Sequence, residues 1–290
     1  MKGWMASTVA AALLTAASLS ATPLHDGWQA QAASHAVASR AVASQATVTA
    51  MRDVAADRTQ GAPIAASEDG ARITAVVELF TSQGCPACPA ADRDFATYAD
   101  RDDVLALSWH VDYWNYMGWR DTFAKSAHST RQRAYANQLD QGVYTPQIIV
   151  NGMYATVGTR KAEVKRLTEA ARTMPLVPLS IDYAAGSISV SIDVPEGARA
   201  KAEGAQLYLV LFRRSATVDV GAGENGGRKL VYRNIVRDTQ PLGRVMQGRL
   251  TVTLSHADLT HGAHDAAALI VQQDGPGPVI AAASLERPWR

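Results

Sequence analysis

The stretch "ELFTSQGCPACPAAD", from Glu78 to Asp92, contains both cysteines of the 290-residue chain. Cys85 and Cys88 are separated by two residues, so a bond between them closes a very small loop and adds little stability through chain entropy. Small secreted scaffolds that depend on disulfides use many more cysteines. The pair is therefore interpreted as a chemical site rather than a structural clip.

The residues around the pair predict a strand, a turn and a helix. "RITAVVELF", residues 72–80, is a short apolar and β-branched run typical of a buried strand. A helix is expected to begin at Cys85, with Pro86 in the first helical position. The free N–H groups and partial positive charge of a helix N-terminus stabilise a thiolate. We therefore expect Cys85 to be the exposed, low-pKa nucleophile and Cys88 the shielded thiol that resolves a mixed disulfide.

Further strands and helices are predicted downstream. Residues 104–111 form a second apolar run, residues 121–140 read as a helix, and a strand follows Thr145-Pro146. Asn151-Gly152 predicts a hairpin turn. The residues from Pro178 onward alternate between apolar and polar over six or seven segments, which is typical of a β-sandwich.

This order resembles the thioredoxin fold. Several motifs are more specifically similar to a family of secreted, thioredoxin-like bacterial proteins known only as a domain of unknown function, and the similarity covers about Ile73 to Leu285. The motifs are "HVDYWNYMGW" (110–119), "VYTPQIIVNG" (143–152) and "GENGGRKLVYRNIVRD" (223–238). The resemblance implies an α/β thioredoxin-like domain at residues 71–175, followed by an all-β sandwich-like domain at residues 176–290.

The resemblance also carries expectations about single residues. It implies that the bond before Pro146 is cis, that Pro146 lies against the cysteine pair, and that Thr145 offers backbone groups to a bound peptide. It implies no established activity. The chain has Pro86-Ala87 between the cysteines where relatives often have two serines, so the direction of electron flow cannot be inherited.

The N-terminus predicts export. Residues 1–21 read as a signal peptide, with Lys2 before a short apolar stretch, and an uncleaved anchor is the alternative. Residues 22–70 are rich in Ala and Ser and are interpreted as a flexible linker, with an amphipathic helix as the alternative. A periplasmic or secreted location is expected. The net charge of +1 indicates neither nucleic acid nor an anionic membrane as a partner.

Other side chains have candidate roles beside the pair. Glu78 is a candidate proton relay to Cys88, the alternative being a solvent-facing or salt-bridged residue. Tyr113 and Trp114 are candidates for a substrate groove, the alternative being a satellite core. His110 could join Cys85 and Cys88 in a metal site, although hydrogen bonding by His110 and Asp112 to the aromatic loop is the simpler interpretation.

The leading hypothesis is an exported thiol–disulfide oxidoreductase that acts on protein or small-molecule thiols through Cys85, Cys88 and Pro146, without a cofactor. The alternatives are a non-catalytic binding module that uses the β-domain, and a protein that handles copper or zinc through the cysteines and His110. The glycine-rich loop within residues 218–229 is predicted to lie near Cys85 and the aromatic segment 109–119.

Overall fold

The computed structural model describes residues 72–260 and 262–285, which belong to one compact unit. The expected signal peptide (1–21) and the whole of the expected linker (22–70) lie outside the described residues. Within the described part of the chain, no helix has the length and apolar character needed to cross a membrane.

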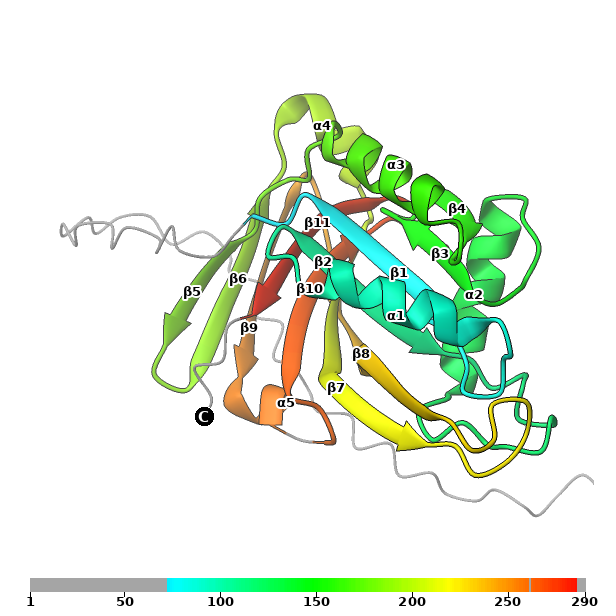
Figure 1. The fold of residues 1–290 in the computed structure, drawn as a ribbon. Helices are drawn as coiled ribbons and strands as arrows, with labels where there is room; N and C mark the ends of the chain where they lie inside the picture. Colours follow the sequence, from blue (N-terminus) through cyan, green and yellow to red (C-terminus); the bar gives the residue numbers. More distant parts are fainter. Residues whose placement is uncertain (1–71, 261, 286–290) are drawn as a thin grey trace, which may run out of the picture. The chain divides into compact units, whose positions relative to one another are not determined.

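Helices and strands alternate in the first half of the described chain, and strands dominate the second half (Figure 1). In chain order the elements are β1 (Ala75–Thr81), α1 (Cys88–Ala99), β2 (Val104–His110), α2 (Ser126–Gln138), β3 (Gln147–Val150), β4 (Tyr154–Val157), α3 (Lys161–Arg172), β5 (Ser180–Ala184), β6 (Ser187–Asp193), α4 (Glu196–Ala202), β7 (Gln206–Asp219), β8 (Lys229–Arg244), β9 (Arg249–Ser255), α5 (His256–Thr260), β10 (Ala266–Gln272) and β11 (Val279–Leu285).

Eight of the strands form one mixed sheet in the order β11-β10-β7-β8-β2-β1-β3-β4. Its two halves meet where β2 runs parallel to β8, with Ser108 opposite Ile235. Side chains reinforce this junction: Ser108 Oγ donates to the Arg233 carbonyl at 2.8 Å, and Asn234 Nδ2 donates to the Ala106 carbonyl at 2.9 Å. The remaining strands form a second sheet in the order β5-β6-β9.

The predicted fold class is therefore wrong. An α/β thioredoxin-like domain followed by a separate all-β sandwich would keep the strands of residues 71–175 and 176–290 in different sheets, whereas both ranges contribute to the eight-stranded sheet. One apolar core also includes Phe80 and Tyr135 from the first range and Phe212 and Ile270 from the second. Alternation identifies strands but not their partners, and the pairing of β2 with β8 joins residues far apart in sequence.

The second sheet explains why the later strands resembled a sandwich. Apolar side chains of β6 and β9 pack against β7, β10 and β11 in a core of their own. These include Ile188 and Leu254 from the small sheet and Leu209 and Leu269 from the large one. The sandwich-like packing is real, but it shares its larger sheet with the first half of the chain.

Alternation along β1 sorts its side chains onto two faces, which positions the site. Val77 and Leu79 pack in the core under α1 and α3, and Thr81 follows on the same face. Val76 and Phe80 belong to the opposite core, which includes Tyr135 of α2, and Glu78 lies between them on that face. Residues buried on both faces explain the nearly continuous apolar sequence of this central strand.

The short hairpin between β3 and β4 forms as predicted. Asn151 and Gly152 both have positive φ, 48° and 67°, and are the two central residues of a turn closed by the Met153 N–H and the Val150 carbonyl at 3.0 Å, within a three-residue loop. Its strands pair antiparallel, with Val150 opposite Tyr154. This hairpin places the segment with Thr145 and Pro146 at the start of β3.

Candidate functional site

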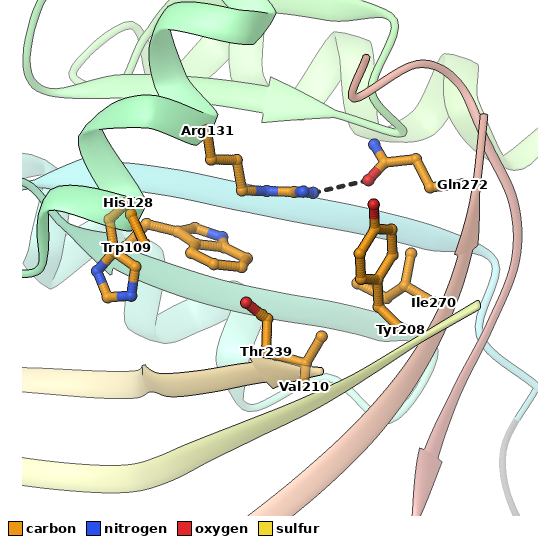
Figure 2. A pocket seen from close by; sticks show the side chains of 9 residues that line it. Trp109, His128, Arg131, Tyr208, Val210, Thr239, Ile270 and Gln272 are labelled. Carbon is orange, nitrogen blue, oxygen red and sulfur yellow. Dashed lines mark hydrogen bonds between the residues drawn. The ribbon is translucent and has the colours of Figure 1, made fainter. Parts of the chain in front are cut away.

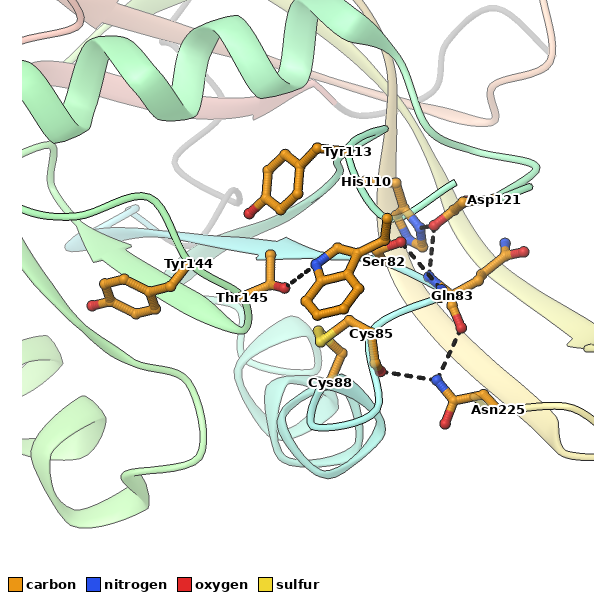
Figure 3. Close-up of a disulfide and its surroundings, with 12 residues drawn as sticks. Ser82, Gln83, Cys85, Cys88, His110, Tyr113, Asp121, Tyr144, Thr145 and Asn225 are labelled. Atoms are coloured by element: carbon orange, nitrogen blue, oxygen red, sulfur yellow. Dashed lines mark hydrogen bonds and ion pairs between the residues drawn. A yellow bond between two sulfur atoms is a disulfide. The ribbon is translucent and has the colours of Figure 1, made fainter. Parts of the chain in front are cut away.

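The two cysteines form a disulfide at the start of α1, with their Cα atoms 5.4 Å apart (Figure 3). The helix begins at Cys88 rather than at Cys85, and Pro89 rather than Pro86 occupies its first turn. The reason is a tight turn between the cysteines, in which the N–H of Cys88 donates to the Cys85 carbonyl at 3.3 Å. No side chain caps this helix among the described residues, so its first N–H groups are not engaged by a competing side chain.

Both cysteines are fully buried, so the expectation that Cys85 is exposed is wrong for the disulfide state. Trp114 spans the distance from the cysteine turn to Thr145. Its carbonyl lies 3.1 Å from the point where a Cβ on Gly84 would be, and its indole Nε1 donates to Thr145 Oγ1 at 2.7 Å. The absence of a side chain at Gly84 lets Trp114 lie directly on this turn.

The Thr145-Pro146 peptide bond is cis, as the resemblance implied. Pro146 is buried next to α1: its Cβ and that of Ala91 each lie 3.1 Å from the position of a Cβ on Gly158. Figure 3 shows Thr145 next to the disulfide. The structure thus brings Cys85, Cys88 and Thr145 together.

Tyr113 is partly buried and points to α2. Its hydroxyl donates to Gln132 Oε1 at 3.0 Å, and burial raises its pKa. Tyr113 packs against the main core together with Trp114, which matches the core alternative, and their role in a substrate groove stays a prediction.

The glycine-rich loop between β7 and β8 contacts the cysteine turn, which confirms its predicted position. Asn225 is fully buried, and its Nδ2 donates to the carbonyls of Gln83 and Cys85, both at 2.9 Å (Figure 3). Arg228 Nη1 donates to Asn225 Oδ1 at 2.8 Å and orients the amide. Asn225 thus fixes the backbone on which Cys85 is carried.

The same loop also packs on the aromatic segment. A Cβ on Gly223 would lie 2.8 Å from the Met117 carbonyl, and a Cβ on Gly221 would lie 3.1 Å from the Trp119 ring. Trp119 Nε1 donates to Gln83 Oε1 at 2.8 Å. Glycine is therefore needed here for close approach, and the loop, the aromatic segment and the cysteine turn form one packed unit.

A buried hydrogen-bonded pair of side chains lies behind the cysteine turn. His110 Nδ1 and Asp121 Oδ2 are 2.8 Å apart, and both side chains are fully buried. Asp121 also accepts from the backbone N–H groups of Gln83 at 2.7 Å and Phe123 at 2.8 Å. Burial acts to raise the pKa of Asp121, but His110 and these hydrogen bonds outweigh it and the pKa lies below its usual value. An ionised Asp121 only accepts, so His110 Nδ1 carries the proton in this bond.

Asp92 is the functional candidate that the sequence interpretation missed. It lies on α1 four residues after Cys88 and is 5% exposed. Neither of its carboxylate oxygens has a hydrogen-bond partner in the described structure, and the same holds for Thr81 Oγ1, His110 Nε2 and the Tyr232 hydroxyl. Burial raises the pKa of Asp92 to about 7, opposed by the nearby His110. The available signal was its spacing, because residues four apart share a helix face.

Glu78 is not brought to the cysteines. Arg131 Nε donates to Glu78 Oε1 at 2.8 Å, the Tyr135 hydroxyl donates to the other oxygen, and the Glu78 side chain is only 1% exposed. The face of β1 that carries Glu78 is opposite to the face that supports α1. The salt-bridged alternative considered for Glu78 therefore matches the structure.

A cavity of about 110 Å³ lies on this opposite face, between α2 and strands β7, β8 and β10 (Figure 2). Trp109, His128 and Arg131 line it from one side and Tyr208 from the other. Arg131 is held within it by Gln272, at 2.9 Å, and lies 4.7 Å from the centre of the Trp109 ring. Burial lowers the pKa of His128 to about 4, so this ring is neutral at neutral pH.

The alternative metal site does not form in this arrangement. Cys85 and Cys88 are bonded to each other, and His110 pairs with Asp121. Across the described residues, no group of three or more His, Cys, Asp or Glu side chains is placed to hold a metal ion. His110 is instead the buried hydrogen-bond partner of Asp121. Asp112 accepts a 2.5 Å hydrogen bond from the Ser129 hydroxyl.

Comparison with solved structures identifies two similar proteins. An X-ray crystal structure of a protein from Agrobacterium tumefaciens is 34% identical, covers 74% of this chain and 94% of its own, and superposes with a TM-score of 0.62. HBP35 of Porphyromonas gingivalis is 14% identical, covers 74% of this chain and 75% of its own, and has a TM-score of 0.48. No curated protein matches the sequence.

The family model described as "Protein of unknown function (DUF1223)" matches residues 76–272, a range that begins in β1 and ends in β10. It includes the cysteine turn, the aromatic segment, the Thr145-Pro146 bond and the glycine-rich loop. The chain therefore belongs to the DUF1223 family.

Proposed function

We propose that this protein is an exported thiol–disulfide oxidoreductase that uses the Cys85–Cys88 pair. The observation that carries the proposal is the disulfide itself, placed at the uncapped N-terminus of α1. Because the loop it closes is so short, the bond contributes little to the stability of the fold. The helix N-terminus instead favours a thiolate, which is the reactive form of cysteine.

The arrangement supports distinct roles for the two sulfurs. Cys85 precedes the helix, and exposed Pro86 and Ala87 follow it directly. Cys88 lies inside the first turn and above the buried Asp92 face of α1. Cys85 is therefore the sulfur that exchanges with a substrate thiol, and Cys88 is the leaving and resolving sulfur.

Access to Cys85 requires movement of the segment that covers it. Trp114 and Thr145 are both half-buried and joined by a single side-chain hydrogen bond. Displacing the indole opens the turn without disturbing a strand. A protein thiol, or a small thiol, could then reach Cys85 and bond to the freed backbone next to Thr145.

Export is proposed from the sequence of residues 1–21. A compartment outside the cytoplasm is one in which a disulfide between the only two cysteines can persist. The direction of electron flow then depends on the potential of the pair relative to that compartment.

Trapping of mixed disulfides tests the proposal. Cys88→Ser should accumulate mixed disulfides with a peptide that contains an internal disulfide, detected by mass spectrometry: the Cys85 thiolate attacks the peptide disulfide and releases one peptide thiolate, and the resolving sulfur is absent. Cys85→Ser should accumulate few or none, and the double variant serves as the control. Equal trapping by both single variants, or trapping by neither, would contradict the assignment.

A further inference from the structure

One helical turn separates Cys88 from Asp92 on α1, which places a carboxyl group beside the resolving sulfur. Side chains four residues apart on a helix have Cβ atoms roughly 6 Å apart. Cys88 and Asp92 are both buried on the side of α1 that faces the sheet. A carboxyl at this position is close to the sulfur that must gain or lose a proton in each redox cycle.

Asp92 lies among buried polar atoms that make no hydrogen bond of normal geometry, and the Thr81 hydroxyl is near enough to favour its carboxylate form. Thr81 Oγ1 from β1, His110 Nε2 from β2 and the Tyr232 hydroxyl from β8 are all buried and unpartnered in the described structure, as are both Asp92 oxygens. Buried polar atoms are normally paired, so five together in one place need an explanation. A proton that moves within the group provides one.

The charged and titratable groups around Asp92 define how its proton is held. Burial and Asp121 favour the neutral acid, while His110, the Thr81 hydroxyl and Arg93 favour the carboxylate. Tyr232, whose pKa is raised by burial and by Asp92, stays neutral, and Arg228 opposes that shift. Burial is the largest of the effects on Asp92 and brings its pKa to about 7, where a group can both donate and accept protons near neutral pH.

The structure assigns to Asp92, supported by the His110–Asp121 pair, the role of proton donor and acceptor for the Cys88 thiol. This inference rests on the proposed redox function. Asp121 fixes the His110 ring through Nδ1, which leaves Nε2 on the opposite side of the ring. Asp121 also accepts from the N–H of Gln83, so the same pair is tied to the turn that carries Cys85.

The step that Asp92 serves is the opening of the disulfide. A substrate thiolate attacks Cys85 Sγ and forms a new S–S bond, while the Cys85–Cys88 bond breaks and its electron pair leaves on Cys88 Sγ. The protonated Asp92 carboxyl gives its proton to that thiolate and becomes a carboxylate beside His110. The substrate is a dithiol, and its second thiolate then attacks the substrate sulfur that is bonded to Cys85. This forms the substrate disulfide and releases Cys85 as a thiolate. The dithiol is oxidised by two electrons and the cysteine pair is reduced.

The test is the pH dependence of disulfide reduction by dithiothreitol in the purified protein, with each rate divided by the concentration of the dithiothreitol thiolate. For the wild type we expect this rate constant to fall as pH rises through about 7, when Asp92 loses its proton. Asp92→Asn should lack this step and be slower at pH 6 by roughly 100-fold, a usual size for general acid catalysis. Asp94→Asn is the matched control: Asp94 lies on the same helix, is half-exposed and pairs with Lys161.

The outcomes separate this inference from the proposed function. If Asp92→Asn keeps the wild-type pH profile, or is slowed equally at every pH, the proton-transfer role is wrong while the redox function stands. If Asp92→Asn does not fold, the wild-type profile decides alone, and a profile without a step near pH 7 overturns the role. If dithiothreitol does not reduce the native wild-type disulfide at any pH, the proposed function and this inference both fail.

Discussion

At the scale of single residues, Asp92 has the environment with the clearest consequence for stability. A buried carboxylate without a hydrogen-bond partner is energetically unfavourable. Burial therefore raises the pKa of Asp92, and the carboxyl group keeps its proton up to a higher pH. The pKa of the carboxyl is 3.8 before burial and about 7 in the folded protein. The folded state therefore binds this proton more tightly than the unfolded state does, and Asp92 reduces stability as pH rises from about 4 to about 7.

We expect Asp92→Asn to stabilise the protein above pH 7 and to have little effect below pH 4. Each pKa unit corresponds to about 1.4 kcal/mol, so the difference should approach about 4 kcal/mol and then level off. Urea unfolding of both proteins between pH 4 and pH 8 measures it, with Asp94→Asn as the control. A difference that does not change with pH would show that Asp92 is not a neutral acid in the fold.

Asn225 gives the second prediction at this scale. Asn225→Ala removes the donor to two buried carbonyls, those of Gln83 and Cys85. The expected loss of unfolding free energy is about 1 to 3 kcal/mol, because the Gln83 carbonyl loses the Asn225 donor and the Cys85 carbonyl keeps only the N–H of Cys88. We also expect faster reduction of the disulfide, since the turn carrying Cys85 is no longer fixed.

Glu224→Ala is the control for Asn225, because Glu224 is exposed in the same loop. Both variants are compared by urea unfolding and by alkylation of the thiols released by dithiothreitol. An Asn225→Ala protein as stable as the Glu224→Ala protein would contradict the inference that Asn225 fixes the backbone of the cysteine turn.

The sequence revealed some of these residues and not others. The cysteine pair was apparent because its spacing is itself a chemical signal, and Asn225 lay in a loop whose glycines indicated close approach to another surface. Asp92 was missed because its significance depends on burial, and burial depends on β2 and β8 closing over α1. No local pattern contains that information.

At the scale of secondary structure elements, one face of β1 lies under α1 and the cysteine site, and the other face packs in the core with α2. Thr81 lies on the α1 face near Asp92, and Glu78 lies on the α2 face in an ion pair with Arg131. A shift of one residue along a strand reverses the face, which is why the distance in sequence from Glu78 to Cys85 was misleading.

We therefore expect Glu78→Gln to affect stability and not proton transfer. Leaving Arg131 buried with a neutral partner should cost about 3 to 5 kcal/mol of unfolding free energy. The step near pH 7 in the rate of disulfide reduction should remain. Glu163→Gln, which disrupts an exposed pair with Arg166 on α3, should change neither quantity noticeably. Loss of the pH step in Glu78→Gln would restore Glu78 as a proton relay.

The start of α1 shows how local chemistry was predicted nearly correctly. Pro86 was expected in the first turn of the helix, but the helix begins at Cys88 and its first turn contains Pro89 instead. The bond between the Cys88 N–H and the Cys85 carbonyl closes the turn before the helix begins. The helix N-terminus still meets the disulfide, so the chemical argument holds with the register shifted.

At the scale of the whole molecule, the second half of the chain completes the sheet of the first half. β8 lies beside β2, and the core under α2 contains Val210, Phe212 and Ile270 from β7 and β10. The strands were identified from their alternation, yet their assembly into one sheet depends on contacts between distant segments. The prediction of two domains therefore failed although most individual elements were found.

We expect a fragment of residues 71–175 to be unable to fold independently. It retains all of the cysteine turn but loses the strand that covers the edge of β2 and much of the main core. Circular dichroism and amide proton dispersion in NMR spectra should show no cooperative structure, whereas residues 71–290 should unfold in one transition. A cooperatively folded 71–175 fragment would support an independent domain after all.

The central claim is that a fully buried disulfide is nevertheless redox-active in the folded protein. The direct measurement is the rate at which dithiothreitol reduces Cys85–Cys88 at neutral pH without denaturant, followed by alkylation and mass spectrometry and compared with the global unfolding rate in the same buffer. We predict that reduction is faster than unfolding and increases with dithiothreitol concentration, because only the Trp114 segment must move. Reduction that is limited by the unfolding rate would show a purely structural disulfide and would contradict the account.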